Sequence, residues 1–318
     1  MGTTLNNNCY LKRINECKLT FIISVFNSEL FVEKLLNSLL NQTNTNFNVV
    51  LCDDGSSDSS LKILENYSYR FLSKNIGYKV ITKSNGGVAS AVNRMLPYVE
   101  TDYFISCDSD DWYDLDVVEG IYNYLVNNSD FSLGVMSVRY ITEEGFVKRT
   151  ASFNKHDCKM TLYDRFIRAI KIPCFSGIFI YNLRDFSKFN KGLNIYESRY
   201  GQNWQLLLPL VKNVELTNFN VLFYNHLSRK ESLSHSTETF QKEYNLYVGY
   251  SDILVHVLNH LGDFGRAQER AQFYCTYLCN LCFQNGQRSL FFRHFRCAKK
   301  SLRLYVKMFV IFFQIWKK

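Results

Sequence analysis

The sequence predicts an α/β protein with a mixed, mostly parallel sheet, flanking helices and a helical C-terminal extension. Three observations support this prediction. Short apolar runs alternate with helical patterns through the first 140 residues, which is the order that a mostly parallel sheet requires. Two acidic segments follow two of these runs. Residues 288–318 contain nine Lys or Arg residues and no Asp or Glu.

Composition and charge exclude several classes of protein. A chain of 318 residues with 47% hydrophobic and 21% charged residues can bury a core, which excludes a largely disordered protein. Only 3 Pro and 15 Gly exclude collagen-like and low-complexity classes. The net charge is +8, and residues 288–318 carry +9 of it, so the remaining residues sum to −1. An anionic partner is therefore expected for the tail alone.

The ten Cys residues are too sparse for a disulfide scaffold. A polar, Asn-rich start lacks the pattern of a signal peptide, so reduced thiols and a cytoplasmic location are expected. Cys275, Cys279 and Cys282 fall on one stripe of a helix. This pattern favours a buried helical face over a zinc site, because no fourth ligand is near in the sequence.

Five apolar runs are expected to form strands of the first domain. They are short and rich in β-branched or aromatic residues, which is typical of buried parallel strands. They cover residues 18–25, 47–52, 78–82, 102–107 and 131–141.

Helical patterns fill the segments between these runs. The first runs to Leu40, and Asn27 or Ser28 is expected to cap its start. Further helices are expected at residues 61–67, 88–96, 115–126, 240–260, 265–283 and 302–316. The change from alternating elements to helices alone predicts one domain over 1–235 and a helical region over 236–318.

Two acidic segments are the first candidates for a functional site. One begins at Asp53 and reads DDGSSD, and the other covers residues 108–111 and reads DSDD. Ligands of such sheets bind beyond the carboxyl ends of the strands, so both segments are expected to face one crevice. Clustered carboxylates there suit Mg²⁺ or Mn²⁺. Either segment alone also fits ordinary turn and capping chemistry.

A glycine-rich segment lies between the acidic ones. Residues 85–93 read NGGVASAVN, and Lys83 precedes them. A helix that begins after two glycines offers backbone N–H groups to a phosphate. The same pattern also fits a helix that simply packs closely on the sheet.

Taken in order, SVFN at 24–27, DDGSSDSS at 53–60, NGGVASAVN at 85–93 and DSDD at 108–111 resemble family 2 glycosyltransferases of the GT-A fold. The resemblance covers roughly residues 18–235 and is most specific in the first 115. It implies inverting transfer of a sugar from a nucleotide diphosphate, with UDP favoured by family habit. A bound Mn²⁺ or Mg²⁺ would neutralise charge on the leaving diphosphate.

The resemblance also implies roles for individual residues. Phe26 would lie against the base, Asp54 would accept a hydrogen bond from a uracil N–H, and Asp108 would contact the ribose. Asp110 would bind the metal that bridges the diphosphate, while Lys83 and the glycines would approach the phosphates or the donor sugar. The full set expected to bind the nucleotide sugar is Ser24, Phe26, Asp53, Asp54, Lys83, Gly86, Gly87, Asp108 and Ser109.

The expected general base is less clearly marked. Members of the family carry a Glu-Asp pair where this chain has Gln202-Asn203, and an amide does not accept a proton at neutral pH. Glu197 is the nearest carboxylate and the first candidate, and Asp111 is the second. Glu197 also fits a solvated loop. His226 is a candidate second metal ligand, although a lone His is more often structural.

Two further segments complete the resemblance. Residues 172–177 read IPCFSG and resemble a small-residue turn near the acceptor. Arg229 opens a basic, Ser-rich segment that includes Lys230, Ser232 and Ser234. That segment fits a loop over the diphosphate and equally fits plain surface.

The tail after Ser289 is basic and aromatic. Its uninterrupted apolar part, 308–316, would be about 14 Å long as a helix, about half a bilayer, so it should not span one. Such a helix suits an anionic membrane interface. Packing on the body or on a second copy is the alternative. Nucleic acid is a poorer partner, because no binding motif is present.

The sequence therefore predicts a metal-dependent glycosyltransferase of surface polysaccharide synthesis, peripheral on the inner face of the plasma membrane. Its partners would be a nucleotide sugar, a saccharide or lipid-linked acceptor and the anionic membrane. Two alternatives remain open. A nucleotidyltransferase acting on sugar phosphates would normally show a Gly-rich basic loop after the first strand, where this chain reads SVFNSELF. A degenerate, membrane-bound assembly factor would account for the missing Glu-Asp pair.

Overall fold

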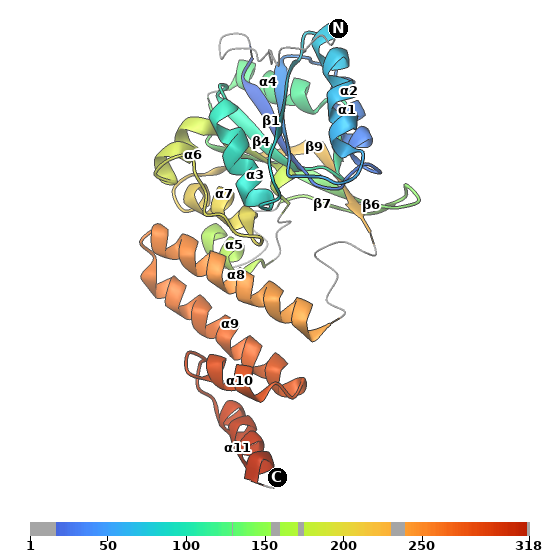
Figure 1. Ribbon diagram of the computed structural model, residues 1–318. Helices are drawn as coiled ribbons and strands as arrows, with labels where there is room; N and C mark the ends of the chain where they lie inside the picture. The colour runs from blue at the N-terminus through green and yellow to red at the C-terminus, as the bar shows by residue number, and fades with distance from the viewer. Residues whose placement is uncertain (1–16, 129, 154–159, 171–174, 230–238, 317–318) are drawn as a thin grey trace. The chain divides into compact units, whose positions relative to one another are not determined.

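The computed structural model describes residues 17–128, 130–153, 160–170, 175–229 and 239–316 (Figure 1). The chain divides into two compact units, residues 1–229 and 230–318, and each is described by itself. The domain boundary expected from the sequence, between residues 235 and 236, lies outside the described residues and stays a prediction.

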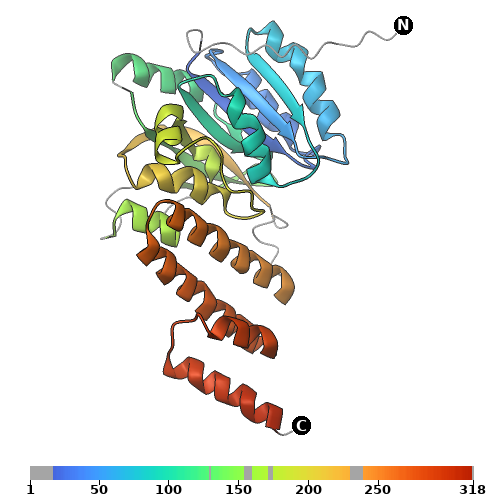
Figure 2. The same ribbon diagram turned by 60° about the vertical axis from the view of Figure 1, so that its left-hand side comes forward.

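Four parallel strands form one half of the sheet in the first unit. Their order is β3-β2-β1-β4, and each pair of neighbours is parallel (Figure 2). Most of their residues are buried, because helices cover both faces. Each begins and ends within one residue of its predicted bounds: β1 Leu19–Val25, β2 Phe47–Asp53, β3 Gly77–Thr82 and β4 Tyr103–Asp108.

The connecting helices are α1 (Val32–Leu40), α2 (Ser60–Ser73), α3 (Val88–Met95) and α4 (Val117–Asn127). The chain reverses direction along the sheet between β3 and β4, and right-handed crossovers then place α3 on the face opposite to α1 and α2 (Figure 1). The predicted cap of α1 is wrong. The helix begins after Phe31 without a side-chain cap, and Asn27 and Ser28 belong to a loop.

The other half of the sheet makes it mixed. The path continues as β8-β6-β9-β5, with β7 paired to β6, and only β6 and β9 are parallel there. Of these strands only β6 (Leu133–Thr142) was predicted, and the expected range of 131–141 starts two residues early and ends one residue early. The other strands are β5 Trp112–Tyr113, β7 Val147–Ala151, β8 Phe179–Asn182 and β9 Leu216–Ser228, and the helices are α5 Leu162–Arg168, α6 Leu183–Phe189 and α7 Gln202–Val211.

The register of the central strands positions the site. Val25 of β1 lies opposite Asp53 of β2, and Ser24 of β1 lies opposite Asp108 of β4. Because the three strands are parallel and end at one level, both acidic segments leave the same edge of the sheet. This confirms the predicted placement of the two segments.

The second unit consists of α8 (Phe240–His260), α9 (Phe264–Gln284), α10 (Arg288–Phe295) and α11 (Leu302–Trp316). Cys279 and Cys282 are fully buried in its core beside Leu278 and Phe291, as the helical stripe predicted. Among the described helices, none combines the length and hydrophobicity that a membrane crossing requires.

Gly177 offers a sharp test of packing beneath the site. It lies in a short 3₁₀ turn, Ser176–Ile178, and its carbonyl accepts a hydrogen bond of 2.9 Å from the Tyr113 hydroxyl. A Cβ at this position would overlap the ring of Tyr224. Residues 172–174 of the predicted turn lie outside the described residues.

We expect Gly177→Ala to lower the free energy of unfolding by about 1–3 kcal/mol, since a buried ring must move to admit the methyl group. Urea denaturation measures the change. Gly265→Ala in α9 is the matched control, because no atom lies within 4 Å of its added Cβ. Equal stability of the two variants would contradict the packing argument.

Candidate functional site

Backbone and side-chain hydrogen bonds join the loop after β1 to the loop after β2. The Asn27 side-chain oxygen accepts from the Ser57 N–H (2.8 Å), and the Ser60 hydroxyl accepts from the Ser28 N–H (2.8 Å). Asp58 accepts from the Glu29 N–H (3.0 Å). The later residues of DDGSSDSS therefore hold the two loops together, which leaves Asp53 and Asp54 as the acidic residues of this motif that could define the site.

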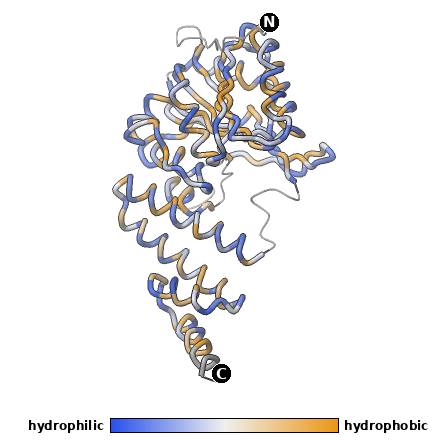
Figure 3. Tube along the Cα trace, in the orientation of Figure 1, coloured by the Kyte–Doolittle hydropathy of each residue, from blue (hydrophilic) through white to orange (hydrophobic). Residues whose placement is uncertain are grey.

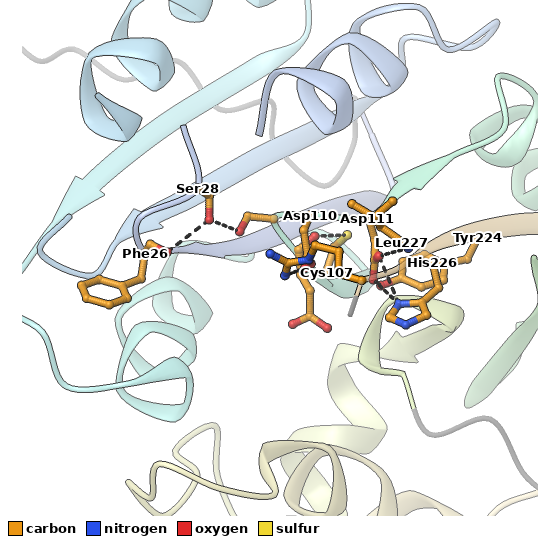
Figure 4. Close-up of polar contacts among 11 residues, drawn as sticks. Phe26, Ser28, Cys107, Asp110, Asp111, Tyr224, His226 and Leu227 are labelled. Atoms are coloured by element: carbon orange, nitrogen blue, oxygen red, sulfur yellow. Dashed lines mark hydrogen bonds and ion pairs between the residues drawn. The ribbon is translucent and has the colours of Figure 1, made fainter. Parts of the chain in front are cut away.

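A second tie joins the β1 loop to DSDD. The hydroxyls of Ser28 and Ser109 share a hydrogen bond of 2.7 Å, and the Ser28 hydroxyl also donates to the Phe26 carbonyl (Figure 4). Ser109 is buried, so its geometry does not support the predicted contact with a nucleotide. The Phe26 side chain remains 49% exposed, as a platform for a base requires.

Asp54 organises the glycine-rich segment. Its carboxylate accepts hydrogen bonds from the Lys83 ammonium (2.6 Å), the Gly86 N–H (3.0 Å) and the Gly87 N–H (2.7 Å). Asp54 is only 3% exposed. This geometry does not support a uracil contact for Asp54, nor phosphate contacts for Lys83 and the two amides, because all these groups bind one another.

Asp53 has the opposite character. It is also 3% exposed, and one carboxylate oxygen accepts a weak hydrogen bond of 3.3 Å from the Ser56 N–H. The other oxygen, Oδ1, is buried and has no hydrogen-bond partner among the described residues. A buried carboxylate oxygen without a donor is costly. Asp53, rather than Asp54, is therefore the residue of this segment with a carboxylate oxygen that no donor of the described residues reaches.

The DSDD segment concentrates negative charge. Burial raises the pKa of Asp108 to about 7, and the charges of Asp111 and Asp110 act in the same direction. Burial and Asp111 also raise the pKa of Asp110, against the attraction of Arg229. The Arg229 guanidinium forms an ion pair with Asp110 and stacks over the Phe31 ring at 4.4 Å. One carboxylate of the segment is therefore already paired with a positively charged side chain of the protein.

Asp111 is the most enclosed carboxylate of the segment. It accepts hydrogen bonds from the Tyr224 hydroxyl, from His226 Nδ1 (3.1 Å) and from the Leu227 N–H (2.8 Å), as Figure 4 shows. It is 1% exposed. This placement does not support Asp111 as a general base, because its oxygens are occupied by donors that orient β9.

His226 is held on the edge of the site. Its ring stacks on Phe175 with 4.1 Å between centroids and meets Tyr140 edge-on. Burial alone lowers the pKa of His226, but the hydrogen bond to Asp111 and the charges of Asp111, Asp110 and Asp108 outweigh it and raise the pKa. Since Nδ1 faces Asp111, a ligand would bind through Nε2.

The segment that carries Glu197 is clamped by two amide side chains that sequence reasoning missed. Asn93 of NGGVASAVN donates to the Ile195 carbonyl (2.8 Å) and accepts from its N–H (2.9 Å). Gln205 binds both the N–H and the carbonyl of Tyr196. Glu197 is exposed, and the Asn93 amide lies 3.4 Å from its carboxylate. Asn93 is the last residue of NGGVASAVN, and that position was the only indication in the sequence that it has a structural role near the site.

Metal binding fits the chemistry of these residues, although they do not form a complete cage. Among the described residues, no three His, Cys, Asp or Glu side chains are grouped to hold an ion by themselves. Hard carboxylate oxygens with raised pKa values nonetheless favour a cationic partner. Asp110 already pairs with one cation of the chain, the Arg229 guanidinium. Lys230, Ser232 and Ser234 lie outside the described residues.

Comparison with known proteins agrees with this architecture. Residues 20–189 match the domain described as glycosyl transferase family 2. The chain is 35% identical over 118 residues to glycosyltransferase GlyA of Streptococcus pneumoniae, and 32% identical over 120 residues to poly(ribitol-phosphate) beta-glucosyltransferase of Bacillus spizizenii. Each match covers 37% of this chain, but only 16% and 19% of those relatives, respectively.

Solved structures of S. aureus TarS share the fold. TarS 1–349 in complex with UDP-GlcNAc has a TM-score of 0.53 and 18% sequence identity. The alignment covers 88% of this chain and 89% of that one. At this identity the likeness concerns the fold, and it confirms the predicted GT-A class.

The Asp111–His226 hydrogen bond generates a prediction for the metal-free protein. We expect Asp111→Asn to lower the pKa of His226, since burial would then face less opposing charge, and NMR titration of the imidazole measures this. His226 has a folded pKa above its unfolded value of about 6.5. Its stabilising contribution is therefore full below that pH and is lost as pH rises through the folded pKa.

His294 provides an internal control in the same spectra. Its pKa is lowered by burial and by Arg293, and it lies in the other unit, so it should not change. An unchanged pKa of His226 would show that the hydrogen bond does not govern its protonation.

Proposed function

The chain belongs to glycosyl transferase family 2, and we propose that it moves a sugar from a nucleotide diphosphate to a saccharide or lipid-linked acceptor in surface polysaccharide synthesis. One observation carries this proposal. The half-exposed ring of Phe26, the unpartnered oxygen of Asp53 and the carboxylates of DSDD all lie at the carboxyl ends of three adjacent strands.

The donor is proposed to be a UDP-sugar. Phe26 would stack on the base, and Asp53 Oδ1 would accept a hydrogen bond from it, which would supply the missing partner. Asp108, partly exposed at the end of β4, would accept from the ribose. The TarS structure with UDP-GlcNAc supports a nucleotide-sugar donor through the shared fold.

Mn²⁺ or Mg²⁺ would be held by Asp110, with His226 Nε2 as a second ligand. When bound, the ion would stabilise charge on the departing diphosphate. The chain's own residues would do the rest. Asp111 keeps His226 in place, and Ser28 fixes the loop that carries Asp110 through its bond to Ser109.

Glu197 is proposed as the general base that accepts the proton of the acceptor hydroxyl. It is exposed, as a residue that meets an incoming acceptor must be, and Asn93 holds its segment against the helix that follows the glycines. Acceptor activation by a carboxylate contributes about 10²- to 10⁴-fold to such reactions. The enzyme is proposed to work at the inner face of the plasma membrane, close to a lipid-linked acceptor.

Asp110→Ala tests the metal role. We expect transfer, and the slow hydrolysis of a UDP-sugar, to fall by about 10²-fold or more, because the charge on the diphosphate is no longer neutralised. The thermal shift that Mn²⁺ adds to UDP-sugar binding should disappear as well. Asp116→Ala removes the same charge from an exposed position nearby and should keep both. A fully active Asp110→Ala enzyme would be incompatible with the proposal. A wild-type protein that binds no UDP-sugar would instead favour an assembly factor.

Glu197→Gln tests the base. The substitution keeps the shape and the contact with Asn93 but cannot accept a proton, so kcat should fall by about 10²-fold or more while donor binding is unchanged. Product formation is followed by chromatography, with the exposed Glu65→Gln as control. Full turnover of Glu197→Gln would require another base.

A further inference from the structure

Helix α11 leaves an apolar stripe in solvent. Leu302 is 81% exposed, Tyr305 40%, Val306 52%, Phe309 56% and Val310 39%. These positions recur at i, i+3, i+4, i+7 and i+8, so they lie on one face of the helix. The stripe is about 12 Å long at about 1.5 Å per residue. Figure 3 shows the hydrophobic character of this helix.

The opposite face of α11 is already used. Leu304 is 2% and Ile311 is 4% exposed, and both pack in the core formed with α9 and α10. The exposed stripe is therefore distinct from the face by which α11 packs on the rest of its unit. It is a second apolar face on a helix that is anchored within its unit.

Basic residues border the stripe. At about 100° per residue, Arg303 and Lys307 lie between the exposed stripe and the buried face. Residues 288–316 contain seven Lys or Arg residues and no Asp or Glu. An apolar stripe with a basic border, on a segment without acidic residues, is complementary to a surface that is anionic outside and apolar beneath.

A polar cavity of about 600 Å³ lies on the same side as this basic border. Arg303, Lys307, Ser301 and Asn285 line it together with Glu243, which accepts a hydrogen bond of 2.7 Å from the Tyr277 hydroxyl. The Lys307 ammonium donates to Asn280 (2.6 Å). The donors of this wall have the chemistry that binds a phosphate.

We propose that α11 is a membrane-docking element. Its stripe enters the boundary between headgroups and acyl chains of an anionic bilayer, and Arg303 and Lys307 bind lipid phosphates at the mouth of the cavity. This inference rests on the proposed function for its purpose, since docking would bring the enzyme to a lipid-linked acceptor. The docking itself depends only on the second unit.

A second copy of the chain is a poorer occupant of the stripe. Face-to-face contact of two α11 helices would bring together two segments that each carry seven basic residues and no acidic ones. Like charges at such an interface oppose association. An anionic bilayer turns the same charges into attraction.

Vesicle co-sedimentation of the full chain tests the proposal. We expect binding to phosphatidylcholine vesicles that contain phosphatidylglycerol, and much weaker binding to phosphatidylcholine alone. Val306→Glu combined with Phe309→Glu should reduce the partition coefficient by about tenfold or more, because two inserted side chains become charged. Arg303→Gln combined with Lys307→Gln should reduce binding to the anionic vesicles and weaken its salt dependence.

The matched control changes the same residue types elsewhere. Val126 is 80% and Phe146 is 73% exposed in the first unit, so Val126→Glu combined with Phe146→Glu should bind as the wild type does. Circular dichroism checks that every variant is folded. Equal binding by the stripe variant and the wild type would overturn the proposal. The proposal would also be overturned if the wild type bound no vesicles and instead formed a dimer that the stripe substitutions, but not the control substitutions, dissociate.

The measurement also separates this inference from the proposed enzyme function. Vesicle binding is recorded without donor or metal, and the thermal shift by a UDP-sugar is recorded without vesicles. A chain that fails only the first test still has its donor site. One that fails only the second still docks on membranes.

Discussion

The parallel pairing of β1 with both β2 and β4 is the constraint on which the candidate site depends. It brings Asp53 and Asp108 to one level on either side of β1. The five carboxylates of Asp53, Asp54, Asp108, Asp110 and Asp111 then lie at one edge of the sheet, and each needs a donor or a cation. Many hydrogen bonds in the site supply these carboxylates with donors.

The carboxylates meet the requirement in different ways. Asp54 is neutralised from within by Lys83 and two backbone amides, and Asp111 by three donors of β9. Asp110 relies on Arg229, and one oxygen of Asp53 has no donor in the part of the chain that the structure describes. The carboxylates thus differ in how fully donors of the chain occupy them, and the less occupied ones are those proposed to meet ligands. Neighbours in sequence have opposite roles, because adjacent side chains leave the backbone in different directions.

The two units apply the same principle to different surfaces. In the first, polar groups without partners mark where a nucleotide sugar is proposed to bind. In the second, α11 exposes five apolar side chains while its other face is packed in a core. Each is a surface whose solvation is unfavourable without a partner. The basic charge of residues 288–316 identifies the kind of partner for the second.

The sequence by itself determined the four parallel strands β1 to β4, three of the four described helices of the C-terminal unit and the edge of the sheet that carries the acidic segments. These follow from local apolar periodicity, which a chain displays without reference to distant residues. Strands β5 and β7 escaped, because β5 has two residues and β7 is exposed, so neither carries a clear pattern. Only the tertiary structure decided which acidic residues of DSDD have donors, since Tyr224 and Leu227 of β9 and Arg229 just after it lie more than 100 residues away. Hydrogen bonds between distant segments leave no periodic trace in the sequence, and this is why Asp53 and Asp54 could be told apart only in three dimensions.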